Sequence, residues 1–174
     1  MSRLIDALLR FTRLDQGTET LLMETIDISQ LVTILCHDQQ LLAVKGIQLK
    51  TDIETGLSLL ADRDLLVQLV DNLVRNAYRY GKHKGEILVA LKDKDDMIEF
   101  LVQDNGIGIA EADLAHIWQS FYRVDQTRHA THPNSFGLGL ALVKKIAEVY
   151  GAKVEVDSQL EKGSTFRILF PKSS

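Results

Sequence analysis

Apolar residues recur at helical spacing in several segments of the chain. The first stripe, Leu4, Leu8, Phe11 and Leu14, ends before Gly17, a residue suited to a helix C-terminus. A helix that presents one apolar face must pack that face against another element. The stripes predict helices at residues 4–14, 29–42, 62–80, 114–118 and 140–150.

Alternating or continuous short apolar runs, typical of strands, fill most of the remaining chain. Polar or glycine-containing turns at residues 92–96 and 161–163 separate neighbouring runs, as in hairpins. Strands joined by short turns and mixed with helices predict an α+β fold, a two-layer α/β sandwich with a mixed sheet and helices on one face. The predicted strands are residues 47–49, 57–61, 86–91, 97–102, 153–157 and 165–170.

The same pattern suggests how the chain is organised. Residues 1–17 form an N-terminal helix stub, residues 18–27 a linker of mixed polarity, and residues 28–174 a domain with a full apolar core. Within that domain, residues 122–136 lack periodicity and carry several arginines and histidines. A loop of this length usually signals function.

Composition limits the function classes. The 174-residue chain has a net charge of −4 and no block of basic residues, which argues against a nucleic-acid-binding protein. Its single cysteine, Cys36, excludes an internal disulfide and indicates an intracellular setting. No apolar run approaches the roughly 18 residues of a membrane span, and the first residues are not a signal peptide. We therefore expect a cytoplasmic polypeptide without membrane contact.

The most informative segment follows the strand predicted at residues 97–102. Asp104-Asn105-Gly106-Ile107-Gly108-Ile109 places a carboxylate at a strand end, followed by two glycines one residue apart. The carboxylate can accept a hydrogen bond from an exocyclic amine, and the glycines allow the backbone to approach a flat ligand. Such glycines more often form only a turn, so the interpretation depends on the other motifs.

Two further motifs could contact a phosphorylated ligand. Asn72 and Asn76 share one helix face, either as boundary residues or as oxygen donors near a hard cation. Gly137-Leu138-Gly139 opens a helix, whose first amides can bind an anion, although a hinge is an equal alternative. A Rossmann fingerprint is excluded because Glu111 stands where a third glycine is required, and no Walker P-loop sequence occurs.

Taken in order, these motifs resemble the catalytic ATP-binding domain of bacterial sensor histidine kinases. That superfamily also includes gyrase, the ninety-kilodalton heat-shock chaperone and MutL. The resemblance implies a Bergerat-type ATP-binding fold and covers about residues 25–171. The matching segments are residues 71–80 (the N box), 104–109 (the first glycine box), 121–125 (the F box), 137–141 (the second glycine box) and 163–166.

The resemblance also implies roles for individual residues. Asp104 binds the adenine amine, with Gly106 and Gly108 as the wall of the base pocket. Asn76 holds Mg²⁺ and Asn72 lies beside the triphosphate of ATP. The other implied nucleotide contacts are Arg79, Tyr80, Ile109, Arg123, Arg128, Gly137, Leu138, Gly139, Leu140 and Thr165, of which Thr165 supports Asp104. The residues expected to act in catalysis are Asn72, Asn76, Arg79, Arg123 and Arg128.

Residues 2–15 are similar to the end of the second helix of a kinase dimerisation domain. The first helix of such a domain, which carries the phospho-accepting histidine, is missing, and no histidine here has the family's sequence context. The resemblance therefore implies a catalytic fragment. Its partners would be the histidine-bearing dimerisation domain of the parent kinase and a response regulator receiver domain. The parent would be anchored in the inner membrane.

The sequence departs from the family pattern at two places. Arg79 replaces a lysine, and Asn134, Ser135 and Phe136 replace a flexible glycine run. In related ATPases a glutamate activates water at the position of Asn72, so slow hydrolysis and transfer to an external histidine are expected. The alternatives are an anti-sigma-type serine kinase, which would not need the N-terminal helix, and a nucleotide-binding regulatory interaction module without catalysis.

Overall fold

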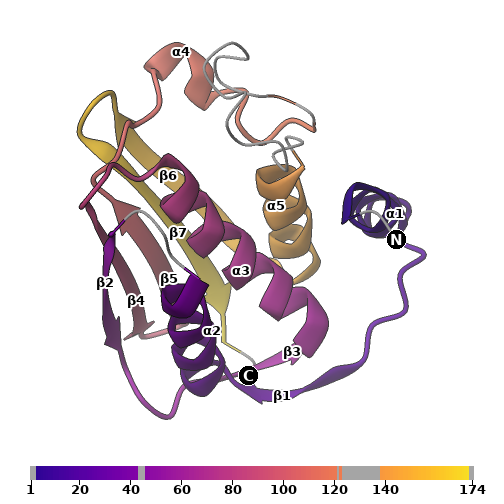
Figure 1. Ribbon diagram of the computed structural model, residues 1–174. Helices are drawn as coiled ribbons and strands as arrows, with labels where there is room; N and C mark the ends of the chain where they lie inside the picture. Colours follow the sequence, from indigo (N-terminus) through magenta and orange to yellow (C-terminus); the bar gives the residue numbers. More distant parts are fainter. Residues whose placement is uncertain (1–2, 43–45, 121, 123–137, 173–174) are drawn as a thin grey trace.

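The computed structural model describes residues 3–42, 46–120, 122 and 138–172 (Figure 1). The predicted α+β class is confirmed, with helices and strands mixed along the described chain. In order, the elements are α1 (Arg3–Gln16), β1 (Met23–Asp27), α2 (Ile28–Leu42), β2 (Gln48–Ile53), β3 (Ser58–Asp62), α3 (Arg63–Tyr80), β4 (Glu86–Lys94), β5 (Met97–Asp104), α4 (Glu111–Leu114), α5 (Gly139–Val149), β6 (Lys153–Gln159) and β7 (Gly163–Pro171).

A five-stranded mixed sheet forms one layer of the domain. Its strand order is β2-β4-β5-β7-β6, with β2 parallel to β4 and every other neighbouring pair antiparallel. Along the central strands, alternate residues such as Phe100, Phe166 and Ile168 are fully buried. On the other face, Arg167 forms an ion pair with Asp157. The alternation explains why only one face of the sheet is covered.

Helices α2, α3 and α5 lie together on that buried face (Figure 1). The apolar stripe of α3, which includes Leu66, Leu69 and Leu73, is completely buried between the sheet and the neighbouring helices. The helix begins after Asp62, whose carboxylate accepts a hydrogen bond from the Leu65 amide. That cap and the buried stripe fix where α3 lies on the sheet.

The N-terminal helix α1 lies alongside α5 (Figure 1). Leu14 is buried at this contact, and Asp15 accepts a 2.7 Å hydrogen bond from Lys145 of α5. The ammonium of Lys145 also lies 5.8 Å from the ring centre of Phe11. The stripe predicted for the first helix therefore has a partner surface.

Two local predictions differ from the structure. Residues 23–27, expected within a linker, form β1, which pairs antiparallel with β3 in a separate two-stranded sheet. Only Ile26 of β1 is buried, so the strand has no apolar alternation that could reveal it. The short helix expected at residues 114–118 is α4, which ends at Leu114, and Ile117 is buried in the turns that follow. Among the described helices, none is both long and apolar enough to cross a membrane.

Candidate functional site

The C-terminal half of α3 carries four of the residues singled out from the sequence. Asn72, Asn76, Arg79 and Tyr80 are all half-buried, at the border between the apolar stripe and solvent. The amide oxygen of Asn72 lies 3.6 Å from the point where a Cβ on Gly139 would stand. The asparagine face of α3 is therefore in contact with the first residue of α5.

The first turn of α5 contains backbone amides that have no carbonyl partner within the helix. Leu138 precedes the helix and is buried, and its carbonyl accepts the first helical hydrogen bond from Leu142. The amides of residues 139–141 lie in the turn where a helix supplies no carbonyl partner. No acidic residue occupies this turn. The beginning of α5 is thus suited to an anionic ligand beside Asn72.

Asp104 ends β5 on the side of the sheet that the helices cover. It is only 7% exposed, and its carboxylate accepts hydrogen bonds from the Gly106 amide at 2.9 Å and from the Ser164 amide. Burial raises the pKa of Asp104 above its ordinary value, and these two hydrogen bonds oppose the rise. The Asp104 carboxylate is therefore a hydrogen-bond acceptor that is held in one orientation and largely shielded from water.

Gly106 and Gly108 lie so close to other backbone atoms that a side chain at either position would collide with them. A Cβ on Gly106 would come within 2.1 Å of the Tyr80 carbonyl oxygen, at the end of α3. The Ile107 amide donates to that same oxygen at 3.2 Å. Gly108 has a φ of +70°, and a Cβ there would lie 2.0 Å from the Gln159 carbonyl oxygen. Residues 106–108 are therefore held between α3 and the β6–β7 turn.

Two serines form a hydroxyl network beside Asp104. Asp104, Ser164 and Ser158 stand opposite one another across β5, β7 and β6. The hydroxyls of Ser158 and Ser164 are 2.7 Å apart, and Ser158 Oγ also accepts a hydrogen bond from the Ile109 amide at 2.7 Å. Neither serine was singled out from the sequence, because their alignment depends on strand register.

The resemblance named Thr165 as the residue that supports Asp104. Register and alternation place Thr165 opposite Gln103, on the other face of the sheet from Asp104. The residue opposite Asp104, which also donates an amide to it, is Ser164. The structure therefore places Ser164 directly beside Asp104, and the supporting role of Thr165 stays a prediction.

The described residues of the three motifs converge on one end of the domain. The turn at residues 106–108 contacts the end of α3, and the middle of α3 contacts Gly139. Ile109 belongs to the same place through its bond to Ser158, and Leu140 follows Gly139 in the first turn of α5. Arg123, Arg128 and Gly137 lie outside the described residues. Among those described, no group of three or more histidine, cysteine or acidic side chains could hold a metal ion.

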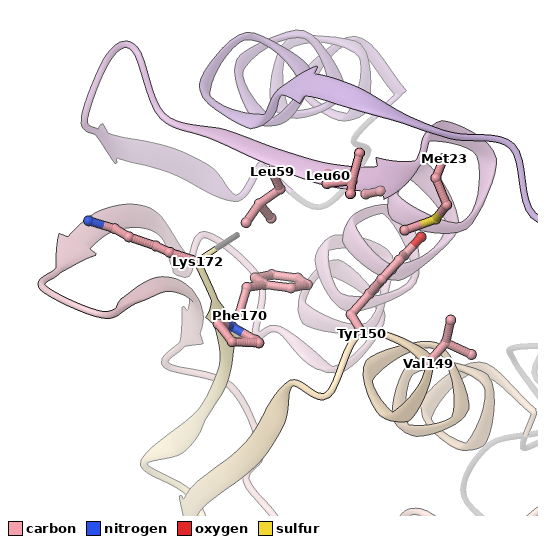
Figure 2. A pocket seen from close by; sticks show the side chains of 9 residues that line it. Met23, Leu59, Leu60, Val149, Tyr150, Phe170 and Lys172 are labelled. Carbon is pink, nitrogen blue, oxygen red and sulfur yellow. The ribbon is translucent and has the colours of Figure 1, made fainter. Parts of the chain in front are cut away.

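A separate cavity of about 280 Å³ lies near the other end of β7 (Figure 2). Its walls come from β1, β3, the end of α5 and the end of β7, and include Leu59, Tyr150 and Phe170. Phe170 pairs with Ile98, whereas Ser164 pairs with Asp104 at the opposite end of the same two strands. The cavity is therefore distinct from the place where the motifs meet.

In a comparison with known protein families, residues 61–174 match a family described as "Histidine kinase-, DNA gyrase B-, and HSP90-like ATPase". Among curated proteins, the sensor-like histidine kinase SenX3 of Mycolicibacterium smegmatis is 33% identical over 174 residues, which is 99% of this chain and 45% of SenX3. The heme sensor protein HssS of Staphylococcus saprophyticus is 33% identical over 99% of this chain and 36% of its own length. The chain thus spans less than half of these relatives.

Solved structures show the same similarity. Full-length ShkA in complex with AMPPNP matches with a TM-score of 0.82 and 27% identity, over 98% of this chain and 36% of ShkA. The nucleotide-free catalytic domain of histidine kinase ThkA matches with a TM-score of 0.73, over 87% of this chain and 98% of its own. Because ThkA is only 21% identical to this chain, this similarity is evidence for a shared fold and for nothing more.

Proposed function

The chain belongs to the histidine kinase-, DNA gyrase B- and HSP90-like ATPase family and is the catalytic ATPase domain of a sensor histidine kinase, and from this premise we propose how its site works. The site binds ATP between α3, the turn at residues 104–109 and the beginning of α5. The observation that supports this most strongly is the contact of both the glycine turn and Gly139 with α3, the helix of Asn72 and Asn76.

Asp104 recognises the adenine base. Its carboxylate accepts from the exocyclic amine of adenine, a donor that guanine lacks at the same position of the ring. The Ser164 and Gly106 amides hold the carboxylate in place, so the base meets an acceptor that is already oriented. Because Gly106 and Gly108 lie close to other backbone, they form a compact wall beside the base.

The polyphosphate lies between the asparagine face of α3 and the first turn of α5. Amides of residues 139–141 donate to phosphate oxygens, helped by the positive end of the α5 dipole. Arg79 adds charge from the end of α3, and its planar guanidinium can contact two phosphate oxygens. Arg123, Arg128 and Gly137 are proposed to complete this set from the neighbouring segment, as the family resemblance implies.

The donor set fits a magnesium ion shared with the nucleotide. Asn76 offers one half-buried amide oxygen, and Mg²⁺ typically takes few protein ligands and keeps phosphate oxygens and waters. The ion would neutralise charge on the transferred phosphoryl group. Asn72, one turn before Asn76 on the same face of α3 and against Gly139, helps to orient the phosphates.

The reaction is transfer of the γ-phosphoryl group to a histidine on another domain. Asn72 carries a carboxamide, which cannot act as a general base toward water, so hydrolysis is slow. The chain's residues therefore contribute position and charge neutralisation, which is most of what phosphoryl transfer requires. The acceptor histidine is proposed to lie on a dimerisation domain of a longer, membrane-anchored sensor kinase, which then phosphorylates a response regulator.

The test is transfer from γ-labelled ATP to a separate histidine-bearing dimerisation fragment. We expect acid-labile phosphate on the fragment, with Mg²⁺ required, and no stable label on this chain itself. Asn76→Ala should abolish transfer while leaving the fold intact, which thermal unfolding checks. Binding of ATP without any transfer would contradict the kinase assignment and favour a nucleotide-binding module.

A further inference from the structure

Asp62 uses both carboxylate oxygens on different parts of the chain. Its Oδ1 accepts from the Leu65 amide at 3.2 Å and caps α3. Its Oδ2 accepts from the Leu22 amide at 2.9 Å, in the segment that connects α1 to β1. Asp62 is 7% exposed, so its bond to Leu65 is buried and its bond to Leu22 is partly buried.

The backbone of Asp62 is fixed to a third element. The Tyr150 hydroxyl, at the C-terminal end of α5, accepts from the Asp62 amide at 3.0 Å and donates to the Asp62 carbonyl at 3.1 Å. Tyr150 extends from α5 toward Met23 of β1 (Figure 2). Burial raises the pKa of Tyr150 to about 12, so the hydroxyl stays protonated and can donate at neutral pH.

A carboxylate is more than the helix cap needs. Serine, threonine or asparagine would cap α3 with one oxygen and without the cost of burying a charge. Only a carboxylate presents two acceptors to two separate amides, here those of Leu65 and Leu22. The choice of residue is explained by the second bond, to the segment that follows α1.

We propose that Asp62 is a positioning residue for phosphoryl transfer, linking the segment after α1 to the two helices that carry the nucleotide site. This inference rests on the proposed function. Asp62 stands at the start of α3, which bears Asn72 and Asn76, and is bound to the end of α5, which begins at Gly139. With the contact of α1 on α5, its bond to Leu22 fixes the site relative to whatever domain precedes α1.

Two substitutions break the Leu22 bond in different ways. Asp62→Asn keeps one oxygen for the cap, and the NH₂ group that replaces the other oxygen cannot accept from the Leu22 N–H. Leu22→Pro removes the donor and leaves Asp62 unchanged. Leu22→Ala is the matched control, because it keeps the amide and truncates a side chain that is 78% exposed.

Each variant is measured in two settings. In the first, the chain phosphorylates a separate histidine-bearing dimerisation fragment in trans. In the second, the same fragment is joined in frame ahead of α1, so that the donor site and acceptor are connected through residues 17–22. Affinity for a non-hydrolysable ATP analogue is measured for every variant. The exchange rate of the residue-22 amide is measured for every variant except Leu22→Pro, which has no amide hydrogen there.

We expect Asp62→Asn and Leu22→Pro to slow transfer in the fused protein by about fivefold or more. Trans transfer and analogue affinity should stay within about twofold of the unsubstituted chain, as should every value for Leu22→Ala. Asp62→Asn should also expose the Leu22 amide to exchange. These results would separate positioning from folding, because a merely structural loss would lower analogue affinity and trans transfer as well.

An unchanged or faster rate in the fused protein, with the Leu22 amide exposed in Asp62→Asn, would overturn the positioning role and leave Asp62 as a helix cap. Equal losses in the fused and trans settings would overturn it too, since the effect would then be on the site itself. Absence of transfer by the unsubstituted chain in both settings would instead overturn the proposed function, and this inference with it.

Discussion

At the scale of single residues, strand register decides which side chains lie beside Asp104. Asp104 and Asn76 could be selected because a carboxylate after a strand and an amide on a helix have recognisable chemistry. The serine network could not, since Ser158 and Ser164 meet Asp104 only through the register of three strands. The same register places Ser164, and not Thr165, opposite Asp104.

Ser164 and Thr165 provide a matched pair for testing this register. Ser164→Ala removes the hydroxyl that lies 2.7 Å from Ser158 on the face of Asp104, and should weaken ADP binding by about 1 kcal/mol. Thr165→Val alters a side chain on the opposite face and should change it by less than about 0.5 kcal/mol. Calorimetric titration measures both. A larger effect from Thr165→Val would favour the supporting role of Thr165 that the family resemblance implies.

The raised pKa of Asp104 predicts an acid-side loss of adenine binding. Protonation removes the negative charge and leaves one good acceptor oxygen, so affinity falls as pH drops through a pKa held above the ordinary value by burial. Protonation of Asp104 does not lower the stability of the folded domain over this pH range. Because folding raises the pKa of Asp104, this carboxyl stabilises the folded state at low pH, and that contribution is lost as pH rises.

The measurement is the ratio of ADP affinities of the unsubstituted chain and Asp104→Asn across pH, in which titration of the phosphates cancels. We expect the ratio to shrink toward one as pH falls. A ratio independent of pH down to about pH 4 would show that the ionised carboxylate does not read the base.

At the scale of elements, hydrophobic periodicity predicted the main helices and most strands, because each buries one regular face. It did not predict β1, a strand that buries only Ile26 and exists through pairing with β3. Nor could it show what the glycines at 106 and 108 are for. Their partners, the carbonyls of Tyr80 and Gln159, are distant in sequence, so the requirement for glycine appears only in the folded chain.

Substitutions at Gly108 and Gly151 can distinguish two reasons for a glycine: a positive φ and close contact with other backbone. Both have positive φ, +70° and +63°, but a Cβ on Gly108 would meet the Gln159 carbonyl, whereas nothing lies within 4 Å of one on Gly151. Gly151→Ala should lower the free energy of unfolding by about 1–2 kcal/mol through conformation alone. Gly108→Ala should lower it by about 3 kcal/mol or more and weaken nucleotide binding. Equal losses in denaturant unfolding would show that the turn can move away.

At the scale of the whole molecule, the mixed sheet could be predicted from the sequence, but its strand order could not. The order β2-β4-β5-β7-β6 depends on the β2–β4 and β5–β7 pairings, which join strands far apart in the chain and which local patterns do not encode. The convergence of the three motifs is likewise a property of the fold. The turn that follows Asp104 and β5 contacts the end of α3, and α5 begins in contact with the middle of α3.

The most direct test of this account is calorimetric titration of ATP and GTP, each with Mg²⁺, into this chain and into Asp104→Asn. We expect ATP to bind at least about tenfold more tightly than GTP, because the buried carboxylate finds a donor only on adenine. Asp104→Asn should weaken ATP binding by about 1–3 kcal/mol. Equal affinities for ATP and GTP, or unchanged ATP affinity in Asp104→Asn, would contradict the central claim that this cleft recognises adenine through Asp104.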